Sequence, residues 1–89
     1  MPNDLDPNEL TGRVLRIIAE TQRIPLESVT VDKTFADLKI DSLDGINIVF
    51  ALENEFGISI PDEGVESMRS VQDAVEGVRT LVEQKVSAS

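Results

Sequence analysis

The chain has 89 residues and a mass of 9.8 kDa, which is enough for one small domain and excludes a large multidomain enzyme. Its 17 Asp and Glu outnumber 8 Lys and Arg, and the net charge of -9 disfavours binding to DNA, RNA or anionic membranes, so we expect basic protein partners and no nucleic acid. There is no Cys, His, Trp or Tyr, which removes most nucleophiles, general bases and soft metal ligands, so we expect neither enzymatic activity nor a metal site.

The first helix is expected over residues 7–22. Asp6 is suited to cap it, Pro7 to occupy its first position, and Pro25 lies just beyond its end. Its apolar residues recur at helical spacing and are Leu10, Val14, Ile17 and Ile18. The residues before this helix are unlike a secretory signal, and the longest apolar run is far shorter than a membrane span. We therefore expect a cytoplasmic protein without membrane insertion.

A long loop is expected between this helix and the next. Residues 24–40 mix isolated apolar residues with charges and turn formers, and they show the period of neither a helix nor a strand. Loops of this length are usually functional or fixed to the domain. We expect Val29, Phe35 and Leu38 to fix this one, with Phe35 inserted into the core.

The second long helix is expected to begin at Asp41 or Ser42 and to end at Gly57, since glycine commonly terminates helices. Its apolar residues form one broad stripe of Leu43, Ile46, Ile48, Val49, Phe50, Leu52 and Phe56. The simplest interpretation assigns Ile46, Phe50 and Phe56 to the core, together with Val71, Val75 and Val78 of the last helix. An alternative leaves Leu43 and Ile46 partly exposed, where they would contact partners.

The remaining chain predicts a short link and two further helices. Residues 58–61 are typical of an extended segment, after which Asp62 can cap a brief helix over residues 63–68. Ser70 begins a capping arrangement, and the clearest amphipathic helix follows it. The chain is thus expected to be all-α: one domain over residues 1–89, with its core at 7–86, built as a small antiparallel four-helix bundle of three main helices and one short one.

Ser42 is the candidate for chemical modification. It lies where a polar loop turns into a helix, so its hydroxyl should project near the unpaired N–H groups of the first helical turn. These donors and the helix dipole favour a bound or attached phosphate. On these residues alone a structural interpretation is favoured, namely that Asp41 or Ser42 is simply an N-cap.

The flanking segments Phe-Ala-Asp-Leu-Lys-Ile-Asp-Ser-Leu-Asp (35–44), Ala-Leu-Glu-Asn-Glu-Phe-Gly (51–57) and Ile-Pro-Asp-Glu (60–63) closely resemble the acyl carrier protein family. The resemblance covers nearly the whole chain. It implies that a phosphopantetheinyl transferase attaches phosphopantetheine from coenzyme A to Ser42. Acyl groups would travel on the arm as thioesters, to enzymes of fatty-acid, lipid or related acyl biosynthesis. The arm would supply the thiol that a chain without cysteine lacks.

The acidity of the chain is concentrated around this serine. No Lys or Arg lies between Ile40 and Met68, and the acids there are Asp41, Asp44, Glu53, Glu55, Asp62, Glu63 and Glu66. An ordinary solvated face would look the same, but the position beside Ser42 favours a docking surface for the basic patches of acyl-handling enzymes. The predicted docking residues are Asp41, Leu43, Asp44, Ile46, Glu53, Glu55, Asp62 and Glu63. We expect the chain to be a monomer.

Three residues depart from the family pattern. The family usually has glycine where Lys39 stands, while Gly45 and Asn47 occupy positions that often hold a hydroxyl residue and a glutamate in carriers of bulk fatty-acid synthesis. These departures favour a specialised carrier over the housekeeping one. Two other functions remain open: a peptidyl or aminoacyl carrier, and an unmodified acidic helical module that binds a basic protein.

Overall fold

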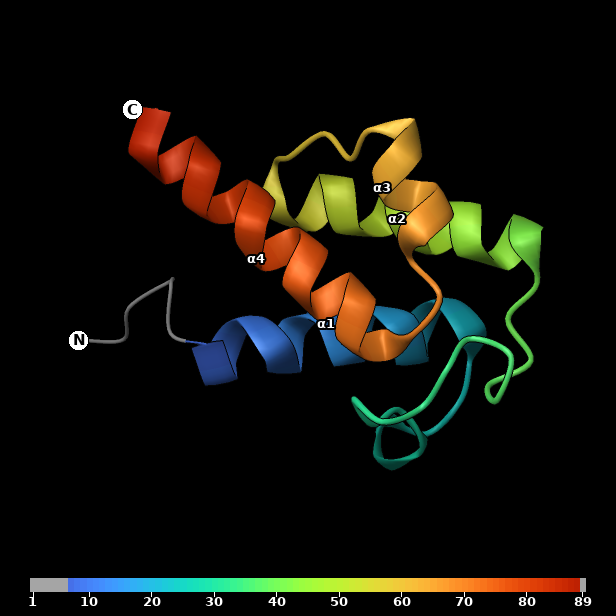
Figure 1. Cartoon of the computed structure of the whole chain (residues 1–89). Helices are drawn as coiled ribbons and strands as arrows, with labels where there is room; N and C mark the ends of the chain where they lie inside the picture. The colour runs from blue at the N-terminus through green and yellow to red at the C-terminus, as the bar shows by residue number, and fades with distance from the viewer. Residues whose placement is uncertain (1–6, 89) are drawn as a thin grey trace.

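A computed structural model describes residues 7–88 of the chain, with side chains over residues 9–85. The helices are α1 (Pro7–Gln22), α2 (Ser42–Phe56), α3 (Asp62–Ser67) and α4 (Val71–Ala88), and a 3-10 turn, η1 (Leu26–Ser28), lies in the long loop (Figure 1). The predicted all-helical fold is confirmed: the described residues contain no β-strand, only an isolated bridge between Thr34 and Ser70. The expected cap at Asp6 lies outside the described residues.

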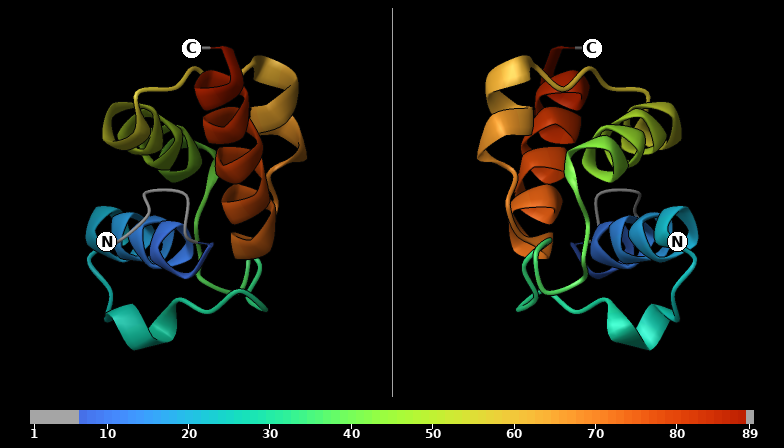
Figure 2. Two further views of the ribbon diagram at one scale, coloured as in Figure 1. Left: turned by 90° about the vertical axis from the view of Figure 1, so that its left-hand side faces the viewer. Right: turned by 90° about the vertical axis from the view of Figure 1, so that its right-hand side faces the viewer.

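Helices α1 and α2 run antiparallel, and α4 crosses both obliquely (Figures 1 and 2). The short α3 lies at the end of the molecule away from α1, and Figure 2 shows it on the other side of α4 from α2. The largest of the fully buried side chains come from α1, α2, α4 and the long loop and are Val14, Ile18, Val29, Ile48, Leu52, Val71 and Val78. Their burial supplies the main driving force for folding. None of the described helices is long and apolar enough to cross a membrane.

Local sequence signals set the ends of the helices. The Asp41 carboxylate accepts a hydrogen bond from the Asp44 N–H at 2.8 Å, which caps α2. Gly57 ends α2 in the left-handed conformation, with φ of 62°. Ser70 caps α4 as predicted, since its hydroxyl accepts from the Asp73 N–H at 3.1 Å. The prediction that Asp62 caps α3 was wrong: Pro61 occupies the cap position and Asp62 is already helical.

The long loop is fixed to the domain as predicted. Val29 is buried, and Phe35 and Leu38 are half-buried and pack against the core. Phe35 therefore covers the core and is not inserted into it as expected. Asp37 and Thr34 exchange backbone to side-chain hydrogen bonds, both at 3.0 Å. The Thr34 N–H, and then its hydroxyl, hold the pKa of Asp37 below its ordinary value. This turn orders the approach to Ser42.

The single broad stripe expected for α2 is in fact two stripes. Ile48, Val49 and Leu52 are buried. Ile46 and Phe50 are 42% and 58% exposed, so their assignment to the core was wrong, whereas Phe56, Val71, Val75 and Val78 do pack in or against it. At 100° per residue, positions 46 and 50 lie nearly opposite positions 48 and 52, and Leu43, which is 73% exposed, lies beside them. The core uses one stripe and leaves the other on the surface.

Candidate functional site

Ser42 is the first helical residue of α2, and its side chain is exposed. The capping interaction belongs to Asp41, whose carboxylate binds the Asp44 N–H. Within the described part of the chain, the Ser42 hydroxyl makes no hydrogen bond. Of the two N-cap candidates, Asp41 is confirmed and Ser42 is not, so the Ser42 hydroxyl is left exposed at the start of a helix.

The backbone on both sides holds Ser42 in place. Ile40 is buried, and its N–H donates to the Phe35 carbonyl at 2.9 Å. On the helix side, the Gly45 N–H donates to the Asp41 carbonyl at 2.8 Å. These bonds fix the position of the Ser42 backbone at the surface of the domain.

Ser42 lies at the edge of a mainly apolar hollow of about 500 Å³ between α2, α3 and the loop. Its apolar wall includes Ile46, Val49, Val65 and Met68. A second hollow of about 410 Å³ shares Ile46, Val49 and Val65 and continues along α2. The wall contributed by α3 escaped the sequence analysis, because the helix has only 6 residues and too few apolar positions to show a period. An exposed serine beside such a hollow fits a flexible arm bearing an apolar group.

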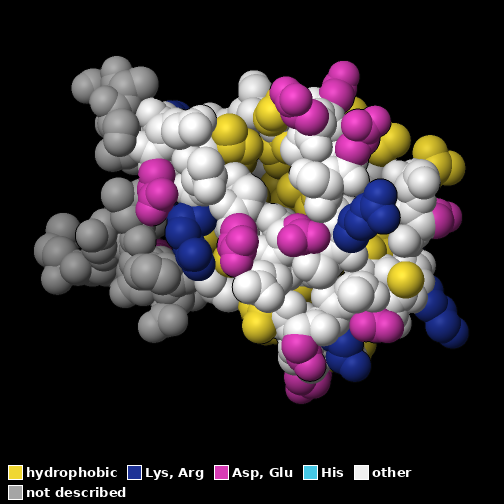
Figure 3. Space-filling view, viewed as in Figure 1, with side chains coloured by type: hydrophobic (Ala, Val, Ile, Leu, Met, Phe, Trp, Pro, Cys, Tyr) yellow, Lys and Arg dark blue, Asp and Glu magenta, His cyan; other side chains and the backbone are white. Residues whose placement is uncertain are grey.

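Of the predicted acidic residues, Asp41 and Glu66 line the hollow beside Ser42. Asp41 and the α3 acids Asp62, Glu63 and Glu66 are exposed, and Asp44 is half-buried. Acidic side chains gather over α3 in Figure 3. The same view shows hydrophobic side chains exposed beside them. The surface around Ser42 thus combines negative charge with apolar groups.

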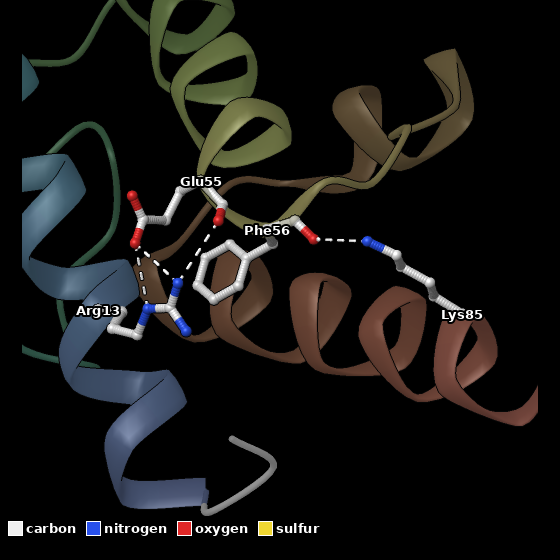
Figure 4. A network of polar contacts seen from close by, with 4 residues as sticks. All are labelled: Arg13, Glu55, Phe56 and Lys85. Carbon is white, nitrogen blue, oxygen red and sulfur yellow. Dashed lines mark hydrogen bonds and ion pairs between the residues drawn. The ribbon is translucent and has the colours of Figure 1, made fainter. Parts of the chain in front are cut away.

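Two of the predicted docking acids have structural partners. Glu55 pairs with Arg13 of α1 at 2.8 Å, and the Arg13 guanidinium lies 4.6 Å from the centre of the Phe56 ring (Figure 4). Glu53 accepts a hydrogen bond from the Ile60 N–H at 2.7 Å, which fixes the link between α2 and α3. Both contacts occupy carboxylate oxygens that could otherwise bind the basic groups of a partner. The docking role of Glu53 and Glu55 stays a prediction.

No group of acids in the described residues is arranged to hold a metal ion. The comparison with known families is decisive for the class of protein. Residues 12–78 match the family model described as the phosphopantetheine attachment site. The chain is 37% identical over 79 residues to an acyl carrier protein of Thermosynechococcus vestitus, covering 88% of this chain and 98% of that one. It belongs to the acyl carrier protein family.

Other relatives agree with this assignment. The mitochondrial acyl carrier protein 2 of Arabidopsis thaliana is 38% identical over 82 residues, which cover 91% of this chain and 65% of that protein. The crystal structure of an acyl carrier protein from Thermotoga maritima superposes with a TM-score of 0.79 and 30% identity, covering 94% of this chain and 99% of that one. As a member of the family, the chain carries acyl groups on a covalently attached phosphopantetheine arm.

One residue close to Ser42 has a strained backbone. Lys39 has a φ of 58°, in the left-handed region that costs a residue with a side chain about 1–2 kcal/mol. Glycine reaches this conformation without that cost. Lys39 therefore holds a strained backbone conformation directly before the segment that leads to Ser42.

Proposed function

We propose that Ser42 is the attachment residue and that the chain, as a single domain, delivers acyl groups to enzymes of fatty-acid or lipid biosynthesis. The observation that carries the proposal is the exposed Ser42 hydroxyl, which α2 presents beside the hollow while Asp41 performs the capping. Once bound, phosphopantetheine supplies the thiol that forms acyl thioesters. The protein provides the attachment point, the apolar wall and the recognition surface.

The test uses the absence of cysteine from the chain. The protein is incubated with coenzyme A and a phosphopantetheinyl transferase, freed of small molecules and titrated with a thiol reagent. We expect one thiol per chain after the reaction and none before it. A protein that gains no thiol with any of several transferases would contradict the proposal.

The docking surface combines the two features found around Ser42. Leu43, Ile46 and Phe50 form the exposed apolar stripe of α2. Asp62 and Glu66 of α3 line the second hollow together with Ile46 and Phe50. Enzymes with a basic patch around an apolar depression would match this pattern. Charge of this kind mainly accelerates encounter, while apolar residues at the centre of an interface contribute most to affinity.

Reversal of one acidic charge tests this surface. Glu63 is exposed, and Glu63→Lys should lower kcat/KM of the transferase for the protein about three- to tenfold at low salt, because it opposes electrostatic steering. Glu83→Lys makes the same change in net charge on an exposed residue near the C-terminal end of α4, at the opposite side of the molecule from the start of α2 (Figure 1), and should leave kcat/KM nearly unchanged. Equal losses in the two variants would show that only net charge matters.

The finer assignments are also part of the proposal. We infer that the chain has no catalytic activity of its own, acts in the cytoplasm as a monomer and serves fewer enzymes than a housekeeping carrier, as Lys39, Gly45 and Asn47 suggest. A peptidyl or aminoacyl carrier is the competing function within the same family. That alternative would be favoured if adenylation enzymes load the modified protein with amino acids while acyl-acyl carrier protein synthetases do not load it with fatty acids.

A further inference from the structure

Arg69 lies in the segment between α3 and α4, and it lines the same hollow as Ser42. Two hydrogen bonds fix its backbone. Its carbonyl accepts from the Phe35 N–H at 3.0 Å, and its N–H donates to the Asp73 carboxylate at 3.1 Å. Because the Phe35 carbonyl in turn binds the Ile40 N–H, the backbones of Arg69 and of the approach to Ser42 are held by one short network.

The side chain of Arg69 is uncommitted, in contrast to its backbone. It is exposed, and among the described side chains the ion pair that forms is between Arg13 and Glu55. No hydrogen bond of the Arg69 guanidinium to another described residue is present. Since arginine stays protonated, a permanent positive charge lies beside the hollow without a partner.

The negative charges around Ser42 would repel an attached phosphodiester unless a cation lies nearby. Asp41, Glu66 and the neighbouring Asp44 are negative, and a phosphodiester on Ser42 adds another negative charge. The Asp44 N–H is already occupied by the Asp41 carboxylate, so it is not available to an added phosphate. Of the residues that line the hollow, Arg69 alone is positively charged.

We propose that Arg69 is a positioning residue for the prosthetic arm: its guanidinium binds the phosphodiester on Ser42 and directs the start of the arm into the hollow between α2 and α3. The inference rests on the proposed attachment at Ser42. Guanidinium and phosphate match in geometry, because two parallel N–H groups can donate to two phosphate oxygens. A lysine or a neutral side chain at this position would not reproduce that contact.

The test compares the modified wild-type protein with Arg69→Gln and with the matched control Arg16→Gln, which removes an exposed arginine from α1. All three are loaded with phosphopantetheine, and the extent of loading is measured by intact mass. In ¹⁵N NMR spectra, the Arg69 side-chain Nε–H signal should shift on modification of the wild-type protein. The ³¹P signal of the phosphodiester should move with added NaCl in wild type and Arg16→Gln, and much less in Arg69→Gln.

We expect the change of the ³¹P shift with added NaCl to be about two- to fivefold smaller in Arg69→Gln than in wild type, which corresponds to the strength of a partly exposed ion pair. Normal loading with identical ³¹P salt dependence in all three proteins would overturn the role of Arg69 and leave Ser42 attachment intact. An Arg69 signal that shifts only when the arm carries a carboxylate-bearing acyl group would also overturn it, in favour of cargo recognition. Loading of none of the proteins would instead contradict the attachment itself.

Discussion

Replacement of Ser42 by alanine should abolish acyl loading while the protein stays folded. Ser42 is exposed, and the cap of α2 is the Asp41 carboxylate, so the free energy of unfolding should stay within about 0.5 kcal/mol of wild type. In the proposed attachment the Ser42 Oγ forms the phosphodiester bond, so its loss leaves no acceptor for phosphopantetheine. The variant is first treated with transferase and coenzyme A. Its loading with a labelled fatty acid by an acyl-acyl carrier protein synthetase should then fall to background.

Ser59→Ala is the matched control, because Ser59 is an exposed serine of the link between α2 and α3. It should load as well as the wild type. Two results would contradict the account: thioester formation that persists in Ser42→Ala, and a loss of loading in Ser42→Ala that accompanies unfolding in circular dichroism. The first would place the attachment elsewhere, and the second would make Ser42 a structural residue.

The largest loss of stability is expected when a core residue of α2 is shortened. Leu52 is fully buried, and Leu52→Ala should lower the free energy of unfolding by about 2–5 kcal/mol, because it removes transfer free energy and leaves a cavity. A domain of this size is stable by only about 4–13 kcal/mol in total. Urea unfolding followed by circular dichroism should show the transition midpoint at a much lower urea concentration.

Leu43→Ala provides the comparison on the same helix. Leu43 is 73% exposed, so the same chemical change should alter the free energy of unfolding by less than about 0.5 kcal/mol. A large destabilisation by Leu43→Ala, or a negligible one by Leu52→Ala, would show that α2 packs through its other stripe. The exposed stripe would then be unavailable as a docking surface.

The helix boundaries that depend on local chemistry could be predicted from the sequence. Proline at the first position of α1, the aspartate before α2 and Gly57 after it each act within one turn of the chain, so no knowledge of the fold is needed to use them. α3 was missed by one residue because a proline and an aspartate compete for its cap. Pro61 has the required extended conformation, which leaves Asp62 inside the helix.

Features that depend on contacts between distant residues could not be predicted in the same way. The Arg13–Glu55 pair joins residues 42 positions apart, and the Glu53 to Ile60 bond needs the link to fold back on α2. The placement of Arg69 beside Ser42 likewise depends on the bond between Phe35 and Arg69. The second stripe of α2 is different, since the spacing of Leu43, Ile46 and Phe50 already contains it.

The attachment at Ser42 is tested most directly by locating the modification within the chain. The protein is treated with coenzyme A and a phosphopantetheinyl transferase, and its peptides are fragmented in a mass spectrometer. The account predicts one phosphopantetheinyl group per chain, carried by Ser42 in the peptide that joins the long loop to α2. A group on any other residue, or a protein that remains unmodified, would contradict it.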